Sequence, residues 1–395
     1  MMRDNTVEAF FALVRAGLWG EADGNLNYNA NDNLFEGVEW EKIYQLAQEQ
    51  SVLGLVLAGL EQYKNLNVLE TSGTRERARA NLDVNQKLLL QWIGEVQIIE
   101  QRNKAMNQFI AELVQAMRKT GIYTLLVKGQ GIAQCYERPL WRACGDVDFF
   151  LSNDNYQKTK DYLVPLASSV ETEGVYGKHL GMVVDGWNVE LHGSLRCGLS
   201  NRVDKELEDV LIDTFNNGNV RSWNDDGVQV FMLGAENDAF YVFNHFLGHF
   251  YKGGIGLRQI CDWCRLLWKY RDTLDLNKLE ARIRKAGLLS EWKAFYNLAS
   301  RYLGMPDLDS RFIFHDSRFD KKADRICSFI LEVGNFGHNR DMSFYHNGLY
   351  FVQKVKSFGR RCGDMISHFR IFPVGTIRFI PYILFNGLRA AVRGE

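Results

Sequence analysis

The chain has 395 residues, a formal net charge of −1 at pH 7, and a composition that is 46% hydrophobic and 24% charged. A chain of this length is long enough for about two or three domains and a sizeable core. The composition excludes a disordered or fibrous protein. The balanced charge does not predict a general nucleic-acid-binding protein.

Seven cysteines at irregular spacing indicate a reducing compartment rather than a disulfide framework, so we expect a cytoplasmic protein. Cys261 and Cys264 form a lone Cys-x-x-Cys within a helical pattern and are predicted to be two buried or half-buried thiols. The first 20 residues lack the apolar segment of a signal peptide. No window has the length of uncharged apolar residues that a transmembrane helix needs.

Residues 1–120 are predicted to form an N-terminal helical region. Apolar residues at three- and four-residue spacing predict helices over 7–18, 40–63 and about 74–119. Gly121 is a plausible stop for the last of these helices.

The pattern changes over residues 121–234, where short apolar runs have the length of strands. The predicted elements are strands at 122–127 and 147–151, a helix at 155–166, and a hairpin at 181–191 that turns at Asp185 and Gly186.

Helical periodicity returns over residues 235–395. The predicted helices are 235–251, 257–270, 276–286, 291–303 and 320–332. Since the strands are confined to one segment, we predict an α+β fold in which a small mixed β-sheet core lies between two helical regions.

The most informative motif is Asp146-Val147-Asp148-Phe149 on the second predicted strand. Side chains alternate along a strand, so Asp146 and Asp148 share one face while the apolar pair takes the other. Two carboxylates this close repel by about 4 kcal/mol at an effective dielectric of about 20. Mg²⁺ is usually held by one or two carboxylates together with substrate phosphates, so the motif predicts a Mg²⁺ or Mn²⁺ site. Alone, the motif is a weak signal, and a solvated strand end with incidental charges is the better explanation.

The residues before this strand predict a phosphate-binding turn. A helix that begins after Gly131 would point free N–H groups of the Lys128-Gly129-Gln130-Gly131 turn at an anion, and Lys128 adds a positive charge. Arg142 is either a structural partner of the acidic pair or a phosphate-binding cation, and its planar guanidinium favours phosphate. A glycine turn followed by paired carboxylates makes nucleotidyl transfer the leading hypothesis.

Glu190 lies between Val189 and Leu191 on an otherwise apolar strand, a costly placement unless that face lines a site. His192 shares the face of Glu190. It is either a strand-end histidine satisfied by the backbone or a residue with a role at the metal or the nucleophile.

This block, from Lys128-Gly129 through Arg142 and Gly145-Asp146-Val147-Asp148 to Val189-Glu190-Leu191-His192, resembles the uncharacterised nucleotidyltransferase family of bacteria. Members of that family belong to the DNA polymerase β-like superfamily and are often found among surface-polysaccharide functions. The resemblance covers about residues 100–270. It implies a nucleoside triphosphate, an unknown hydroxyl acceptor, and Asp146, Asp148 and Glu190 as metal-binding and catalytic residues. The superfamily usually has Gly-Ser or Gly-Gly at its turn, whereas Gln130 follows Gly129 here.

Two pairs on the later helices are candidates for substrate contact. His245 and His249 lie four residues apart on one helix face. They could bind zinc, but no third ligand is evident, and a substrate-facing or packed pair fits better. Arg258 and Asp262 are also four apart, as is common in the resembled family. They are either a helix-surface ion pair or a pair from which Arg258 closes over substrate.

The segment 354–393 carries eight Lys and Arg side chains against Asp364, interleaved with aromatic residues. It could contact an anionic membrane surface, or form an amphipathic helix that packs on its own protein.

Two alternatives to an enzyme stay open. The chain could be a binding or regulatory protein that keeps the fold without the reaction, or a peripheral membrane protein of polysaccharide assembly. The sequence does not indicate the oligomeric state.

Overall fold

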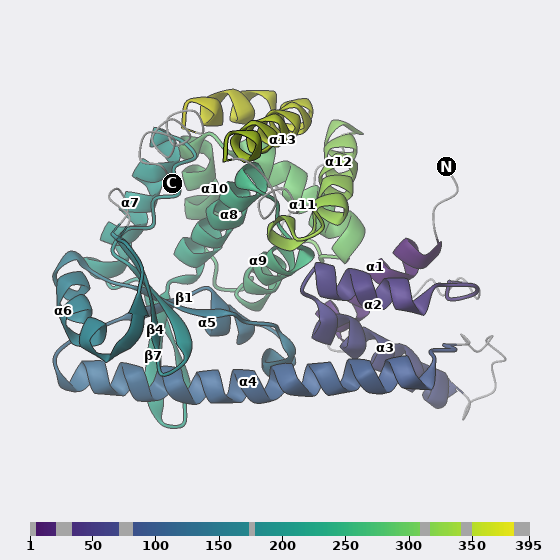
Figure 1. The fold of residues 1–395 in the computed structure, drawn as a ribbon, viewed down its shortest axis with the longest axis horizontal. Coiled ribbons are helices and arrows are strands. Elements are labelled where there is room, and N and C mark those ends of the chain that lie inside the picture. The colour runs from purple at the N-terminus through teal and green to yellow at the C-terminus, as the bar shows by residue number, and fades with distance from the viewer. Residues whose placement is uncertain are drawn as a thin grey trace.

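The computed structural model describes residues 5–20, 34–70, 82–173, 178–308, 317–340 and 350–382. A seven-stranded sheet lies between helices on both of its faces (Figure 1). The fold is α+β, as predicted.

The N-terminal region consists of α1 (Asn5–Trp19), α2 (Trp40–Glu49), α3 (Leu53–Glu70) and the long α4 (Gln86–Lys119). Figure 1 shows α4 running beneath the sheet and on toward α3. The prediction of one helix over 40–63 is wrong. Ser51 adopts a left-handed φ of 56°, and the N–H of Val52 returns to the carbonyl of Ala47 at 2.8 Å, so the chain turns between two helices although the apolar pattern continues across the turn.

The predicted start of α4 near residue 74 is also not where the helix begins. Asn85 caps the helix, because its side-chain oxygen accepts a hydrogen bond from the N–H of Lys87. Residues 82–85 before the cap are not helical, and residues 71–81 lie outside the described part of the chain.

The sheet order is β3-β4-β5-β2-β1-β7-β6. Its strands are β1 (Leu125–Val127), β2 (Asp146–Phe150), β3 (Ala167–Val170), β4 (His179–Val184), β5 (Trp187–His192), β6 (Val220–Asp225) and β7 (Val228–Leu233). The sheet is mixed: β2 pairs in parallel with β5 and β1 with β7, while the other pairs are antiparallel. The hairpin prediction is confirmed, since Asp185 and Gly186 turn between β4 and β5 with φ of 48° and 79°, values typical of a type I′ turn. The sequence did not predict β3, β6 and β7.

Side chains alternate between the two faces of the sheet along β1 and β2, and each face packs against a different set of helices. Leu126 and Phe149 pack in a cluster with α4 and with α6 (Asn153–Leu163). Leu125 and Phe150 belong to a second cluster, which includes the N-terminal and C-terminal helices. Asp146 and Asp148 share the parity of Phe150 and therefore point toward the C-terminal helices.

The remaining helices include the five that were predicted after residue 234, with ends shifted by up to three residues. They are α7 (Asn201–Phe215), α8 (Ala235–Lys252), α9 (Leu257–Lys269), α10 (Leu276–Ala286), α11 (Leu289–Leu303), α12 (Ser317–Val333) and α13 (Tyr350–Ile371). The one-turn α5 (Gly129–Ala133) follows β1. All seven cysteines are free, and Cys261 and Cys264 are buried in α9 as predicted.

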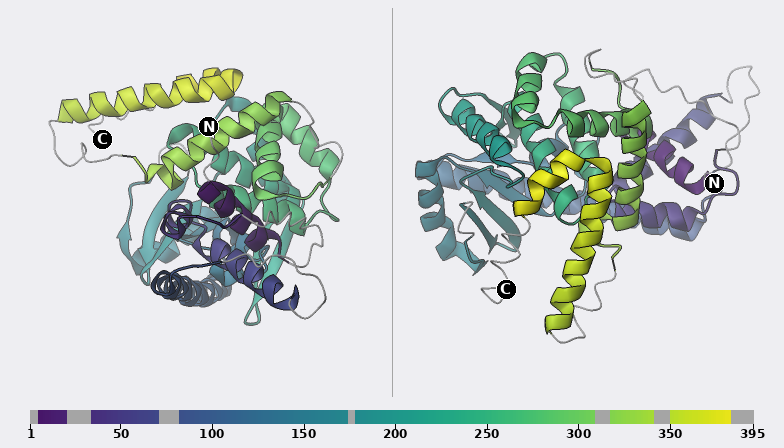
Figure 2. Two further views of the ribbon diagram at one scale, coloured as in Figure 1. Left: turned by 90° about the vertical axis from the view of Figure 1, so that its right-hand side faces the viewer. Right: turned by 90° about the horizontal axis from the view of Figure 1, so that it is seen from above.

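Part of the described C-terminal segment packs on the protein. Figure 2 shows α13 at the periphery, with one end projecting beyond the body of the molecule. The chain then turns into a second helical stretch over 373–382, and Phe372 and Phe379 are buried, with Phe379 5.3 Å from Tyr251 of α8 between ring centroids. Residues 383–395 of the predicted membrane-contacting tail lie outside the described residues.

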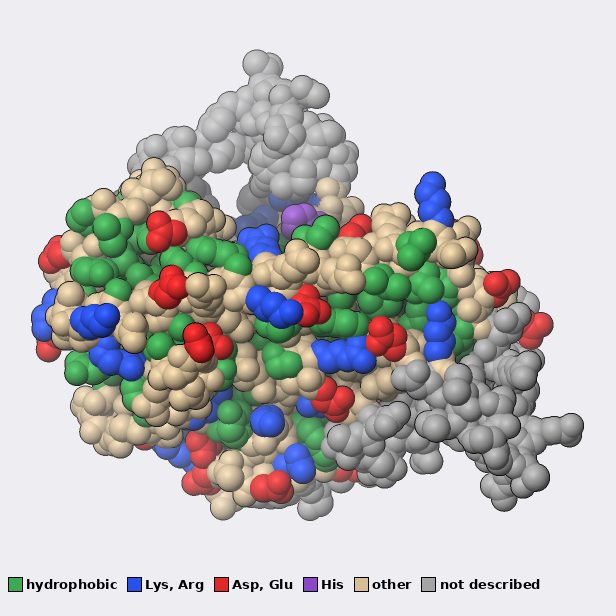
Figure 3. All heavy atoms as spheres, turned by 90° about the horizontal axis from the view of Figure 1, so that it is seen from below, with side chains coloured by type: hydrophobic (Ala, Val, Ile, Leu, Met, Phe, Trp, Pro, Cys, Tyr) green, Lys and Arg blue, Asp and Glu red, His purple; other side chains and the backbone are tan. Residues whose placement is uncertain are grey.

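No helix within the described ranges has the length and apolar character needed to cross a membrane. On the face that Figure 3 shows, Lys and Arg side chains are interspersed with Asp and Glu side chains.

Candidate metal and nucleotide site

The three predicted acids come together at the centre of the sheet. The parallel register of β2 and β5 places Asp148 directly beside Glu190, and Asp146 is two residues back on the same face. One carboxylate oxygen from each of the three lies within 4.8 Å of the others. Burial and the neighbouring charge of Asp148 raise the pKa of Asp146, so the group gains stability from a bound cation.

Lys128 neutralises part of this charge. Its Nζ lies 2.6 Å from Asp148 Oδ1, and the two side chains are only 14% and 1% exposed. Burial opposes the charged form of Lys128, but the charges of neighbouring groups, with Asp148 first among them, and the hydrogen bond to Asp148 together outweigh burial and raise the pKa of Lys128. The backbone of Lys128 has φ 58° and ψ −148°, a conformation that costs a non-glycine residue about 1–3 kcal/mol and is typical of functional sites. The structure thus places Lys128 beside the predicted acids, and its role in phosphate binding stays a prediction.

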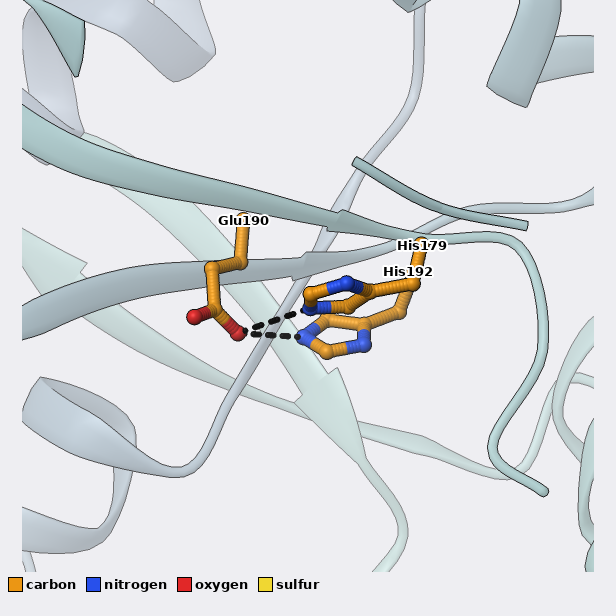
Figure 4. A group of neighbouring side chains, drawn as sticks. All are labelled: His179, Glu190 and His192. Carbon is orange, nitrogen blue, oxygen red and sulfur yellow. Dashed lines mark hydrogen bonds and ion pairs between the residues drawn. The ribbon is translucent and has the colours of Figure 1, made fainter. Parts of the chain in front are cut away.

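Two histidines complete the acidic group (Figure 4). His192 Nε2 lies 2.7 Å from Asp148 Oδ1 and 3.4 Å from Glu190 Oε2. His179 Nε2 lies 3.1 Å from the same oxygen of Glu190. Hydrogen bonds from His179 and His192 lower the pKa of Glu190. Burial opposes protonation of His192, but its bonds to Asp148 and Glu190 raise its pKa.

His179 was missed by the sequence analysis, although a signal existed. Asp185 and Gly186 form a two-residue turn, and residues equally distant from that turn are cross-strand partners. His179 and His192 are such a pair, and the structure has this register. Directly opposed residues on adjacent strands share a face. The alternative that the backbone satisfies the His192 ring is wrong, because Nε2 of His192 contacts the carboxylates of Asp148 and Glu190.

The glycine turn differs from the prediction. The helix begins at Gly129 rather than after Gly131 and has only five residues. Gln130 is 1% exposed, and its amide nitrogen donates to Asn103 Oδ1 at 2.7 Å, so its side chain supports the core and does not face a phosphate. Gly131 packs closely against the core, since a Cβ there would lie 2.9 Å from Met232 Sδ and the methionine side chain would have to shift.

Arg142 and Asp262 form a buried ion pair between the segment before β2 and α9. Nε and Nη2 of Arg142 lie 3.0 and 2.5 Å from the two carboxylate oxygens of Asp262. Of the two alternatives for Arg258 and Asp262, the helix-surface ion pair is not formed, because Asp262 is 4% exposed and pairs with Arg142. Arg258 instead donates from Nη1 to the carbonyl of Ala143 at 2.7 Å. Nη1 of Arg142 and Nε of Arg258 are buried without a partner among the described residues.

His245 and His249 lie side by side on α8, with ring centroids 4.6 Å apart. Burial lowers the pKa of His245 well below its usual value and that of His249 to about 4, so both rings are neutral at pH 7. Neither belongs to a group that could hold a metal among the described residues. His245 also lines the pocket beside the acids, so contact of this histidine with substrate stays a prediction.

A family model described as uncharacterised nucleotidyltransferase matches residues 36–304. The chain belongs to this family. The match includes the whole sheet and every site residue named above. Comparisons with curated proteins and with solved structures found no match.

Membership in a nucleotidyltransferase family implies a divalent metal, and the residues present fit one. The three carboxylates of Asp146, Asp148 and Glu190 offer the hard oxygen ligands that Mg²⁺ and Mn²⁺ prefer. Two of them come from β2, whose register with β5 is fixed by backbone pairing. The fold therefore holds together three oxygen donors of the kind that a divalent cation needs.

Two hollows in this nucleotidyltransferase meet at Asp146. The first extends toward α8 and α9 and is lined by Lys128, Arg142, Asp148, His245 and Arg258 among others. The second is a polar groove over β3, β4 and β5 and is lined by Ser169, Glu171, Gly181, Asn188 and Glu190 among others. The first hollow holds three cationic side chains and the second holds none, so the two sides of the acids differ in charge.

Proposed function

We propose that this protein transfers a nucleoside monophosphate from a nucleoside triphosphate to a hydroxyl acceptor with the help of Mg²⁺ or Mn²⁺. The observation that carries the proposal is the meeting of Asp146, Asp148 and Glu190, from two parallel strands, with Lys128 at the turn before them. The resemblance to polymerase β-like enzymes and to surface-polysaccharide functions motivates the search for a glycan acceptor.

In the reaction, the acceptor hydroxyl oxygen forms a bond to the α-phosphorus. The bond from that phosphorus to the oxygen bridging to the β-phosphate breaks, and pyrophosphate leaves. The hydroxyl proton passes to Glu190, which borders the open groove. A divalent metal bound at the acids supplies charge stabilisation for the attacking and leaving oxygens.

The two hollows support separate positions for the substrates. The triphosphate would occupy the cationic hollow, where Nη1 of Arg142 and Nε of Arg258 have no partner among the described residues. An anion there would satisfy both buried groups through charge-assisted hydrogen bonds. Gly129 and the backbone of its turn border the same hollow. The acceptor would then lie in the groove beside Glu190.

The test uses Asp146→Asn rather than a change at Asp148. Asp148 is buried against Lys128 and His192, so its replacement leaves a buried cation unpaired and endangers the fold. Asp146 has a pKa raised by burial, so the neutral amide is expected to fold at least as well as wild type. Asp154→Asn, an exposed change on α6, is the matched control.

Each variant is incubated with α-labelled nucleoside triphosphates, Mg²⁺ or Mn²⁺, and a lysate of the source organism. Wild type and Asp154→Asn are expected to transfer label, and Asp146→Asn to lose it by at least about 100-fold. Label transfer that persists in the folded Asp146→Asn variant contradicts the mechanism. Absence of transfer and of Mg²⁺-dependent nucleotide binding in wild type favours the binding or regulatory alternative.

We propose membrane contact as a second candidate function because several large apolar side chains are exposed on the C-terminal helices. They include Ile366, Phe369, Val374 and Ile377, which are 56, 48, 59 and 57% exposed. Basic side chains accompany them along the segment, which suits an anionic surface. Flotation with anionic but not neutral vesicles is expected, and a Phe369→Ser, Ile377→Ser variant that floats unchanged contradicts it.

A further inference from the structure

The acids at the site border a second donor group with different chemistry. His179, Glu190 and His192 each offer one ligand atom, and the three atoms lie within 4.8 Å of one another. Figure 4 shows both imidazole rings directed at one oxygen of Glu190, while the other oxygen of Glu190 points away from them.

The spacing of these atoms suits ligands of one ion. Glu190 Oε2 lies 3.1 Å from His179 Nε2 and 3.4 Å from His192 Nε2. Ligands about 2.1 Å from a metal are about 3.0 Å apart in octahedral geometry and about 3.4 Å apart in tetrahedral geometry. An ion bound to these atoms would take the place of the hydrogen bond between His192 Nε2 and Asp148 Oδ1 at 2.7 Å and of the contacts of both rings with Glu190 Oε2.

The chemistry of the set distinguishes it from the neighbouring carboxylates. Imidazole nitrogen suits Zn²⁺, Co²⁺, Ni²⁺ and related ions, whereas Mg²⁺ takes oxygen ligands. We propose that His179, His192 and Glu190 form a site for a divalent transition metal, adjacent to the oxygen-only site of Asp146, Asp148 and Glu190. Glu190 belongs to both groups and would join two ions of different type.

The fold holds this set in place from the backbone. His192 and Glu190 are two residues apart on β5, and His179 is the antiparallel partner of His192 on β4. The type I′ turn fixes that register. The His179 and Glu190 side chains are 42% and 32% exposed, so an ion reaches them from solvent and keeps open positions for water or an acceptor hydroxyl. The proposal goes beyond nucleotidyl transfer, because it concerns binding of an ion and stands whether or not label is transferred.

The test is a Co²⁺ titration of the full chain after treatment with chelator, followed by visible absorption, with excess Mg²⁺ present to fill the oxygen-only site. Wild type is expected to bind one Co²⁺ with a ligand-field band that Mg²⁺ does not displace. His179→Ala is the main variant, since this half-exposed side chain carries little of the core. This variant should bind Co²⁺ at least about 100-fold more weakly than wild type. Loss of a residue that only hydrogen-bonds to a metal ligand already lowers affinity by about 10- to 100-fold, and His179 would be a ligand itself.

Two controls separate the sites. His338→Ala removes an exposed histidine outside both metal groups and should leave the titration unchanged. Asp146→Asn alters only the oxygen group and should keep the Co²⁺ band even if it loses nucleotidyl transfer. The proposal is overturned if wild type shows no band under Mg²⁺, if His179→Ala titrates like wild type, or if Asp146→Asn alone loses the band.

Discussion

Asp262→Asn tests the buried ion pair that connects α9 to the segment before β2. The pair has two charge-assisted contacts, at 3.0 and 2.5 Å, and its side chains are 6% and 5% exposed, so solvent screens it little. Tyr136 also donates to Asp262 at 2.8 Å. Asparagine keeps one acceptor oxygen and replaces the other with a donor that faces the guanidinium. Because Arg142 then stays buried without a counter-charge, we expect a loss of about 3–5 kcal/mol in the free energy of unfolding.

The assay is urea unfolding followed by tryptophan fluorescence, with Glu280→Gln as the matched control. Glu280 pairs with Arg284 on the surface of α10 at 2.6 Å, and loss of such a pair changes stability by about 0.2–0.5 kcal/mol. An Arg142→Met, Asp262→Leu double variant should recover most of the loss, because it removes both charges. A loss for Asp262→Asn no larger than that for Glu280→Gln would refute the reasoning, as would additive losses in the double variant.

Three further predictions concern the turn, the pocket and pH. Gly129→Ala and Gly121→Ala, at φ of 41° and 76°, should each lose about 1–2 kcal/mol of unfolding free energy from left-handed backbone. Only Gly129→Ala should also reduce label transfer, because its turn borders the site; equal transfer in both would contradict this. Arg258→Gln should lower kcat/KM for the triphosphate by about 10- to 100-fold, since it removes a charge-assisted hydrogen bond, and unchanged steady-state kinetics would disprove the contact. Burial lowers the pKa of His368 to about 4, against about 6.5 in the unfolded chain. The folded state therefore binds fewer protons between these values, and stability that is complete above pH 6.5 falls toward pH 4 by up to about 3 kcal/mol. The unfolding free energy of His368→Leu, measured with urea, should lack this part of the pH dependence. If the variant and wild type have the same pH profile, His368 is not its source.

The parts of the site that depend on strand geometry could be predicted from the sequence. Alternation of side chains along β2 places Asp146 and Asp148 on one face. Glu190 was a candidate because an acidic residue on an otherwise apolar strand is costly unless it lines a site. The hairpin turn also followed from Asp185 and Gly186. These are local rules, and they hold because backbone pairing fixes the direction of each side chain.

The parts that depend on long-range packing could not be predicted. Arg142 meets Asp262 from 120 positions away, and no local pattern distinguishes this partner from Arg258. Gln130 turns into the core because Asn103 of α4 accepts its amide. The break after α2 was missed because the apolar spacing continues through Ser51, whose backbone conformation carries no periodic signal.

The most direct test of nucleotidyl transfer compares each nucleoside triphosphate labelled at the α-phosphate with the same nucleotide labelled at the γ-phosphate, under the same conditions and with the same acceptor source. If the α-phosphorus is attacked beside Asp146, Asp148 and Glu190, only the α-label appears in the acceptor and the γ-label is released as pyrophosphate. Transfer of the γ-label to the acceptor would identify phosphoryl transfer and contradict the account.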